Sequence, residues 1–179
     1  RQKLTQANPD AILVVASGGG AALPHRALIE RGYKGHIYQT HAAAGKDLIR
    51  LGGKDVDGAF VIAAPSVVAE QLPASNASKP SALEYVQSYE TAYGAGTRAS
   101  FSASAYDVQK ILQIVIPKAL KTAKPGTQAF RTALRDAVEQ LGSVPVANGV
   151  LNFSKDNHWA YGPTSPVMLR VVNGEWKVE

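Results

Sequence analysis

The stretch AILVVASGGGAALPHRALIERGYKGHIYQTH, residues 11–41, decides the fold. Its first part, Ala11–Ala16, is an uninterrupted apolar run with two β-branched valines, which predicts a strand buried on both faces of a parallel sheet. Directly after it comes Ser17-Gly18-Gly19-Gly20, where the chain must turn sharply and no bulky side chain blocks a close approach. The stretch therefore opens as a strand followed by a tight turn.

The rest of the stretch predicts a helix and a second strand. The helix is expected from about Ala21, with Pro24 in its first turn and Gly32 as its C-terminal stop. His36–Thr40 then has the composition of a short strand. Strand, helix and strand in this order form a βαβ unit with a right-handed crossover.

Ligands of such α/β folds bind at the carboxyl ends of the parallel strands. The two strand ends of the stretch are Ser17–Gly19 and Gln39–His41. The candidate ligand-binding residues are therefore Ser17, Gly18, Gly19, Gln39, Thr40 and His41.

Composition places the chain among ordinary globular proteins. Of its 179 residues 45% are hydrophobic and 18% are charged, and no apolar run approaches the roughly 18 residues that a membrane span needs. The chain contains no cysteine, which excludes disulfides, thiolate metal sites and a cysteine nucleophile. The net charge of +5 comes from scattered basic residues and two short helical stripes, so it does not indicate nucleic-acid binding.

Local patterns predict the remaining elements. Residues 1–8 resemble the end of a helix that Pro9 stops, and residues 66–80 read as a loop. Ser104 and Asp107 form an S-x-x-D helix start, and Thr127 is a second N-cap. Helices are expected over residues 46–51, 81–93, 104–123 and 127–141, strands over 59–64 and 149–153, and a hairpin of 168–172 and 175–178 around Asn173-Gly174.

Several catalytic and cofactor motifs fail on inspection. Gly18 and Gly20 give G-x-G, but Leu23 stands where a dinucleotide fingerprint needs its third glycine. No G-K-S/T follows, as a P-loop requires, and Val15-Ala16 precedes Ser17 where a nucleophile elbow needs G-x. The histidines show no metal-ligand spacing, and His25, His36 and His158 read as surface or half-buried structural residues. His41 is interpreted either as a pocket residue or as an ordinary loop residue.

Several local signatures, in order along the chain, resemble the type I periplasmic solute-binding proteins of ABC importers, the branched-chain amino acid (Leu-Ile-Val-binding) class. Those signatures are Asn8-Pro9-Asp10-Ala11, Ser17-Gly18, Gly32-Tyr33-Lys34-Gly35, Ala105-Tyr106-Asp107, Gly149 with Asn152-Phe153, and Val172-Asn173-Gly174-Glu175-Trp176. The resemblance implies an α/β fold with a parallel sheet and flanking helices in a two-lobed, Venus-flytrap architecture. The chain corresponds to about the C-terminal half of it.

By this resemblance residues 1–99 belong to the second lobe, 100–166 to the first lobe, and 167–179 form a hairpin that returns to the second lobe. The signal peptide and most of the first lobe's sheet are expected upstream of Arg1. The helices of residues 104–123 and 127–141 would then need an apolar cover from that upstream half or from a self-associated copy, because no strand is expected between Gly94 and Asn148.

The resemblance also implies a ligand chemistry. Amino-acid binders of the class often carry an acid at the end of the second strand, where it holds the ligand's ammonium group, and that place falls on His41. Histidine supplies no fixed negative charge, whereas hydroxyls from Ser17 or Thr40 suit a carboxylate. An amino acid therefore competes with an aromatic or other organic acid as the expected ligand.

The function expected from these observations is the periplasmic solute-binding component of an ABC importer. It binds a small solute between two lobes and delivers it to an inner-membrane permease, with no catalytic activity, no cofactor and no metal. The alternative is an effector-sensing domain of a transcriptional regulator or receptor with the same fold, and an enzyme on a doubly wound sheet is a third interpretation.

Overall fold

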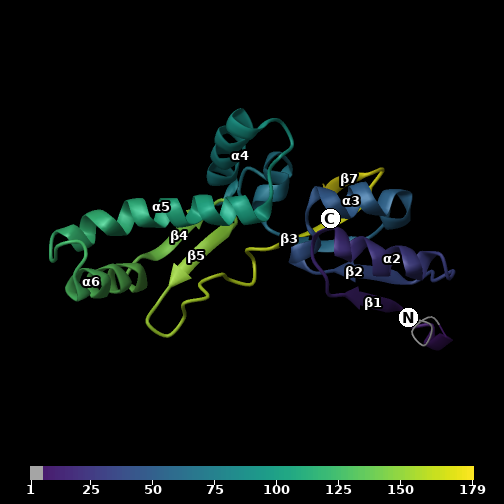
Figure 1. The fold of residues 1–179 in the computed structure, drawn as a ribbon, viewed down its shortest axis with the longest axis horizontal. Coiled ribbons are helices and arrows are strands. Elements are labelled where there is room, and N and C mark those ends of the chain that lie inside the picture. Colours follow the sequence, from purple (N-terminus) through teal and green to yellow (C-terminus); the bar gives the residue numbers. More distant parts are fainter. Residues whose placement is uncertain (1–5) are drawn as a thin grey trace. The chain divides into compact units, whose positions relative to one another are not determined.

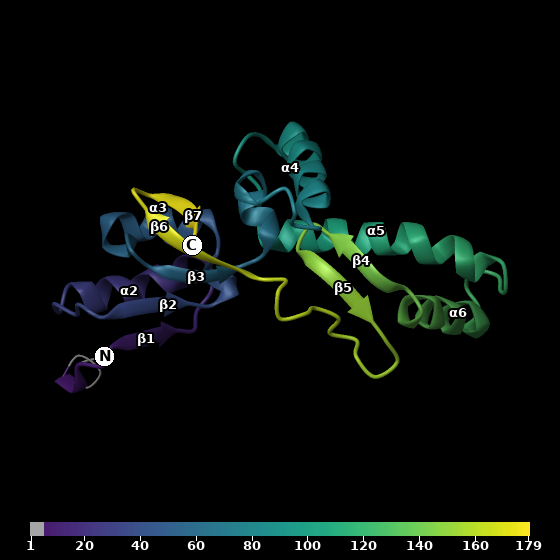
Figure 2. The same cartoon turned by 180° about the vertical axis from the view of Figure 1, so that it is seen from behind.

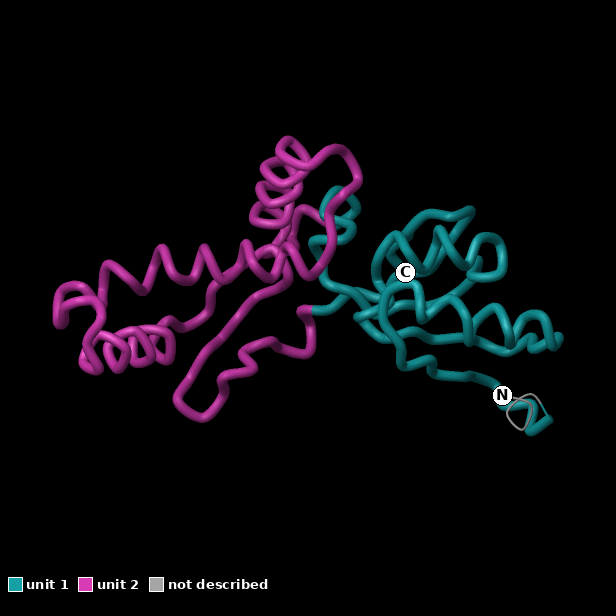
Figure 3. The backbone as a smooth tube through the Cα atoms, in the orientation of Figure 1, with its two compact units in different colours: residues 1–72, 166–179 teal, residues 73–165 magenta. Residues whose placement is uncertain are grey.

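The computed structural model describes residues 6–179 and divides them into two compact units (Figure 3). Unit 1 comprises the chain up to Leu72 together with Pro166–Glu179, and unit 2 comprises Pro73–Ser165. Most of the helical tail expected over residues 1–8 lies outside the described residues. None of the helices within residues 6–179 is long and apolar enough to cross a membrane.

Unit 1 is built on a five-stranded mixed sheet whose strand order is β1-β2-β3-β6-β7 (Figures 1 and 2). The strands β1, β2 and β3 run parallel, and β6 pairs antiparallel with β3 and with β7. Their bounds are Ala11–Val14, His36–Gln39, Phe60–Ala63, Val167–Val172 and Glu175–Val178. The predicted parallel βαβ unit is confirmed, and the last strands of the chain join its sheet.

Helices connect these strands. The helix α2 links β1 to β2, and Gly32 after it has a φ of +77°, as expected for a helix stop. Short 3₁₀ segments follow the strands, including one where the sequence predicts a loop. The bounds are Gly18–Ala21 for η1, Ala22–Ile29 for α2, His41–Ala43 for η2, Lys46–Gly52 for α3, Gly53–Val56 for η3 and Pro65–Gln71 for η4.

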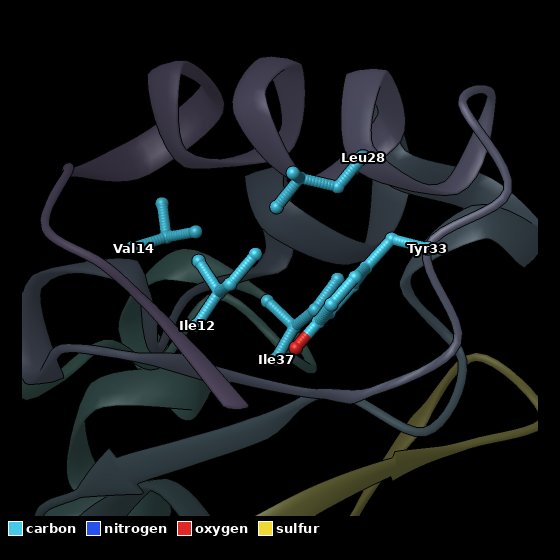
Figure 4. Close-up of a cluster of buried hydrophobic side chains, with 5 residues drawn as sticks. All are labelled: Ile12, Val14, Leu28, Tyr33 and Ile37. Carbon is cyan, nitrogen blue, oxygen red and sulfur yellow. The ribbon is translucent and has the colours of Figure 1, made fainter. Parts of the chain in front are cut away.

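One face of the sheet carries the core of unit 1. Figure 4 shows a cluster between α2 and the first two strands that consists of Ile12, Val14, Leu28, Tyr33 and Ile37. The Tyr33 hydroxyl donates to the Pro9 carbonyl at 2.9 Å, which ties the entry of β1 to this cluster. A Cβ on Gly35 would lie 2.2 Å from the Tyr33 hydroxyl oxygen, so only glycine lets the ring sit there.

The opposite face of the sheet is open, which corrects the prediction of a strand buried on both faces. Leu13 of β1 is 62% exposed, and Val15, which follows the end of β1, is 76% exposed. β1 ends at Val14 rather than Ala16. Ile62 of β3 and Met168 of β6 are also exposed on this face, so within the described residues the whole face, and not the edge strand alone, is uncovered. The register places Leu13, His36, Tyr38, Phe60, Ile62, Met168 and Arg170 on this outer face.

Unit 2 packs three helices around a two-stranded ribbon. α4 is Lys79–Tyr93, α5 is Ser100–Leu120 and α6 is Gln128–Glu139, and β4 and β5 are Gly142–Val146 and Gly149–Phe153. The expectation of no strand between Gly94 and Asn148 is wrong, because β4 pairs antiparallel with β5 there. The small core of unit 2 consists of Val146, Leu151 and Ala160, with Ile111, Val144, Phe153 and Tyr161 packed against it.

The helix starts of unit 2 agree only in part with the sequence. The Thr127 side chain accepts a hydrogen bond from the Phe130 N–H at 3.1 Å, so this N-cap is confirmed. The S-x-x-D start at Ser104 is wrong, because α5 begins one turn earlier and Ala99 is its N-cap. Asp107 is occupied elsewhere, since its carboxylate accepts from the backbone of the β4–β5 turn.

Residues 73–99 cluster with unit 2, whereas the sequence assigned them together with residues 1–72 to one lobe. The physical link is Tyr85 of α4, whose hydroxyl donates to the Ala99 carbonyl at 2.9 Å and accepts from the Ala99 N–H at 3.1 Å. These two bonds fasten α4 to the first turn of α5. The lobe boundaries of the complete protein stay a prediction.

The C-terminal hairpin is confirmed at the predicted turn. Asn173 and Gly174 have φ values of +53° and +75°, and two consecutive left-handed residues are what a two-residue type I′ turn requires. The turn lets β7 fold back on β6, and β6 in turn pairs with β3.

Candidate functional site

The carboxyl ends of β1, β2 and β3 lie at one edge of the unit 1 sheet, because the three strands are parallel neighbours. The chain continues from them into η1, η2 and η4 respectively. η1 contacts η2, and η2 contacts β3, so the predicted site segments are brought together. We call this group of strand ends and 3₁₀ turns the carboxyl edge.

Ser17 and Gly18 form the first turn of the carboxyl edge. Ser17 is exposed and extended, with φ −127° and ψ 152°, and its side chain makes no capping bond to η1. Gly18 follows with a φ of +50°, a left-handed conformation that favours glycine. The Ser17 hydroxyl thus lies at the carboxyl edge and is not used to cap the turn that follows it.

Gly19 lies close to α3. A Cβ at this position would lie 2.4 Å from the Leu51 Cδ1 atom of α3. The absence of a side chain therefore lets η1 lie against α3 without displacing the end of Leu51.

The three candidate residues at the end of β2, Gln39, Thr40 and His41, differ in burial and in their hydrogen-bond partners. Gln39 is 2% exposed, and its Nε2 lies 3.3 Å from the Ala21 carbonyl oxygen and 3.3 Å from His25 Nδ1. The Thr40 hydroxyl donates to the Ala16 carbonyl at 3.5 Å, which links the ends of β1 and β2. His41 is exposed at the start of η2. Gln39 thus lies beneath the edge, whereas His41 lies on it.

The carboxyl edge has no fixed negative charge at its predicted residues. Residues 17–20 and 39–44 contain no Asp or Glu. The His41 side chain is exposed, yet enough protein surrounds the ring that desolvation lowers its pKa from the ordinary value for histidine. His41 is therefore a neutral hydrogen-bonding group at pH 7.

Sequence reasoning missed two components of this region. The third parallel strand, β3, ends at Ala63. Because ligands bind at the carboxyl ends of parallel strands, the residues after β3 also belong to the carboxyl edge, namely Ala64, Pro65 and Ser66. His25, interpreted as a surface or half-buried histidine, is only 1% exposed. Its spacing from Ala22 and Leu28, the other buried residues of α2, was the available signal.

Within residues 6–179, no three or more His, Asp or Glu side chains gather in a way that would hold a metal ion. The chemistry that the carboxyl edge offers is hydrogen bonding, from a serine hydroxyl, a neutral imidazole and turn backbone. Such groups bind and orient a small polar solute.

The comparisons with known proteins agree with this geometry. Residues 2–174 match the family model described as periplasmic binding protein. A search of curated proteins found no match.

Solved structures give close matches over the whole chain. An extracellular ligand-binding receptor from Rhodopseudomonas palustris HaA2 is 44% identical with a TM-score of 0.95, over 99% of this chain and 50% of that one. A leucine-binding protein from Thermotoga maritima is 25% identical with a TM-score of 0.75, over 99% and 46%. A branched-chain amino acid ABC transporter from Thermus thermophilus with bound valine is 14% identical with a TM-score of 0.68, over 99% and 46%, which shows the fold alone.

The chain spans about half the length of these matched structures. The match to the family model covers nearly all of its residues, and the parallel strands with a polar carboxyl edge fit a solute-binding fold. The chain therefore belongs to the periplasmic binding protein family, of type I.

Proposed function

We propose that this chain is part of the solute-binding component of an ABC importer. The complete protein binds a small solute between its two lobes in the periplasm and delivers it to an inner-membrane permease, without catalysing a reaction. The observation that carries the proposal is the family match over residues 2–174, supported by the strand ends and 3₁₀ turns that meet at the carboxyl edge.

The ligand is proposed to be an organic acid without an α-amino group, of the aromatic acid type. An α-ammonium group needs an anionic partner, and residues 17–20 and 39–44 supply none. Ser17 offers a hydroxyl and His41 an imidazole, both of which donate hydrogen bonds to a carboxylate. The ligand contacts proposed for this half are Ser17, Gly18, Gly19, Thr40 and His41, with Gln39 beneath them.

A thermal-shift screen on the intact protein tests the ligand class. Benzoate and 4-hydroxybenzoate are compared with leucine and valine at equal concentration, because a bound ligand stabilises the folded state by RT ln(1 + [L]/Kd). Shifts with the aromatic acids alone are expected. Large shifts with leucine or valine and none with the aromatic acids would overturn the proposed ligand class, and no shift with any small solute would count against the solute-binding function.

The remaining half of the protein is proposed to cover the open apolar surfaces. The outer face of the unit 1 sheet exposes Leu13, Ile62 and Met168, and α5 in unit 2 exposes Phe101 and Val108. Soluble monomers rarely leave extended apolar patches in water. Sedimentation of the isolated 179-residue chain is expected to show self-association, and a compact monomer that unfolds cooperatively would contradict this expectation.

A further inference from the structure

A buried polar pair lies directly beneath the carboxyl edge. His25 projects from α2 and Gln39 from the end of β2, and the two side chains are 1% and 2% exposed. Gln39 also reaches Ala21, the last residue of η1, with its Nε2 at 3.3 Å from the carbonyl oxygen. The pair therefore joins a strand, a helix and the glycine turn that carries Ser17.

The hydrogen-bond partners fix the proton positions in this pair. The Ala21 carbonyl only accepts, so the amide of Gln39 must present its NH₂ group to it. The same NH₂ group lies 3.3 Å from His25 Nδ1, which must then be the unprotonated, accepting nitrogen. His25 therefore carries its proton on Nε2, which suits its hydrogen bond to the backbone of Asp55.

The other end of the Gln39 amide is not satisfied. Its Oε1 is buried and has no hydrogen-bond partner. A buried acceptor without a donor is unfavourable, and a proton on His25 Nδ1 would supply a donor for this oxygen once the amide is inverted.

The charged groups around His25 come from three elements. Asp55 on η3 attracts a proton toward the ring, and Arg26 of α2 pairs with that carboxylate at 3.1 Å and lies 3.8 Å from Glu30. Asp47 and Arg50 of α3 pair with each other at the exposed surface, and the end of β2 contributes only the neutral Gln39. Burial outweighs the attraction of Asp55 and lowers the pKa of His25, so the ring is neutral at pH 7.

We propose that Gln39 is a positioning residue that holds η1 through Ala21 while His25 is neutral, and that protonation of His25 Nδ1 inverts the Gln39 amide and releases η1. This proposal rests on the proposed function only in that η1 carries the candidate ligand residues. It assigns to His25 and Gln39 control over the turn, not contact with the ligand.

The inversion follows from donors and acceptors alone. A proton on Nδ1 places a donor against the donating NH₂ group of Gln39, which is repulsive. Rotating the amide by half a turn presents Oε1 to the new N–H and gives this orphaned oxygen a charge-assisted bond. Oε1 then also faces the Ala21 carbonyl, acceptor against acceptor, so η1 loses its tie to β2.

NMR spectroscopy of the intact protein without ligand tests the proposal. Long-range ¹H–¹⁵N spectra at pH 8 are expected to show His25 protonated at Nε2 only. On acidification the backbone amides of Gly19, Gly20 and Ala22 are expected to shift with the midpoint of the His25 ring, below pH 6.5. The ring of each histidine gives its own NMR signals, so His41 does not confuse the result.

Two variants separate positioning from nonspecific acid effects. In Gln39→Met the η1 amides should no longer follow the His25 midpoint, whereas in His36→Gln, which changes an exposed histidine of the same strand, they should follow it unchanged. An Nδ1–H tautomer at pH 8, or η1 amides that ignore the His25 titration in the unsubstituted protein, would overturn the proposal even if Gln39→Met does not fold. Because no ligand is present, failure of the proposed function would leave these results unchanged.

Discussion

The Asp107 cluster of unit 2 and the Gln39 pair of unit 1 satisfy their buried polar groups to different degrees. In unit 2 both Asp107 carboxylate oxygens accept backbone N–H groups, from Ala147 at 2.7 Å and from Asn148 at 3.0 Å. The Asn148 amide donates onward to the Ser100 carbonyl at 3.1 Å and to the Ser104 hydroxyl at 3.0 Å. In unit 1 Gln39 shares one NH₂ group between two acceptors at 3.3 Å, and its Oε1 has none.

This difference separates a structural polar network from one suited to a change of state. A network whose members are all paired has one best arrangement, and here it fixes the β4–β5 turn to α5. A pair with an unpartnered acceptor can gain a hydrogen bond by changing its arrangement. The Gln39 pair lies beneath the residues that are expected to bind the ligand. The predictions below test whether the two clusters differ in this way.

Asp107→Ala should give the largest loss of stability. The substitution leaves the buried N–H groups of Ala147 and Asn148 without acceptors, which costs about 2–6 kcal/mol for the two groups. Urea unfolding near pH 4.5 measures this loss in the free energy of unfolding. Asp156→Ala, which changes an exposed loop carboxylate, is the matched control and should stay within about 0.5 kcal/mol of the parent. Equal effects of the two variants would show that the Asp107 network does not stabilise unit 2.

The same carboxylate should make stability depend on pH. Burial raises the pKa of Asp107 to about 6, against the opposing effect of the two N–H donors, from an ordinary value of 3.8. The pKa of Asp107 is higher in the folded state than in the unfolded state. The contribution of Asp107 to the free energy of unfolding is therefore fully present below pH 3.8 and is lost as the pH rises through 6. The difference is about 3 kcal/mol between pH 3.8 and pH 7. Asp107→Asn should abolish this slope, and an unchanged slope would assign the pH dependence to other groups.

Substitutions on the carboxyl edge should affect binding and leave stability nearly intact. His41→Ala and Ser17→Ala each remove one hydrogen-bonding group, which corresponds to about 1–2 kcal/mol or roughly a 5–30-fold weaker affinity. Calorimetry with the ligand identified by thermal shift measures it. His36→Ala, on the outer face of β2, is the control and should bind normally. Unchanged affinity in both edge variants would show that the pocket lies elsewhere.

Local chemistry made much of the fold predictable. The Asn173-Gly174 turn and the Thr127 cap depend on a few adjacent residues, and both were predicted. β4 was missed because GSVPV lacks an alternating apolar pattern and Pro145 argues against a strand, yet a two-stranded ribbon tolerates a proline. The open face of β1 was missed because an apolar run does not show whether a neighbour covers it.

The candidate site was predictable in position but not in side-chain direction. The rule that ligands bind at parallel strand ends located Ser17 and His41 on the exposed edge. The same rule does not say which way a side chain points, and the two-residue period of a strand places Gln39 on the inner face with Ile37. Its partner His25 comes from a different element, so only the tertiary structure shows the pair.

Gln39→Met should have a smaller effect on stability than Asp107→Ala, and this sharpens the contrast with Asp107. Methionine has a similar length and no polar atom that needs a partner, so it removes the orphaned Oε1 together with two hydrogen bonds that are long at 3.3 Å. The substitution also leaves His25 Nδ1 and the Ala21 carbonyl without this donor, which partly offsets the gain from removing Oε1. The net loss is expected to be about 1–2 kcal/mol in urea unfolding at pH 7, smaller than that of Asp107→Ala. A loss as large as that of Asp107→Ala would mean that the Gln39 pair is a structural network like that of unit 2. A small loss would show instead that unit 1 keeps its buried polar pair for a reason other than stability, because an apolar side chain would serve the fold nearly as well.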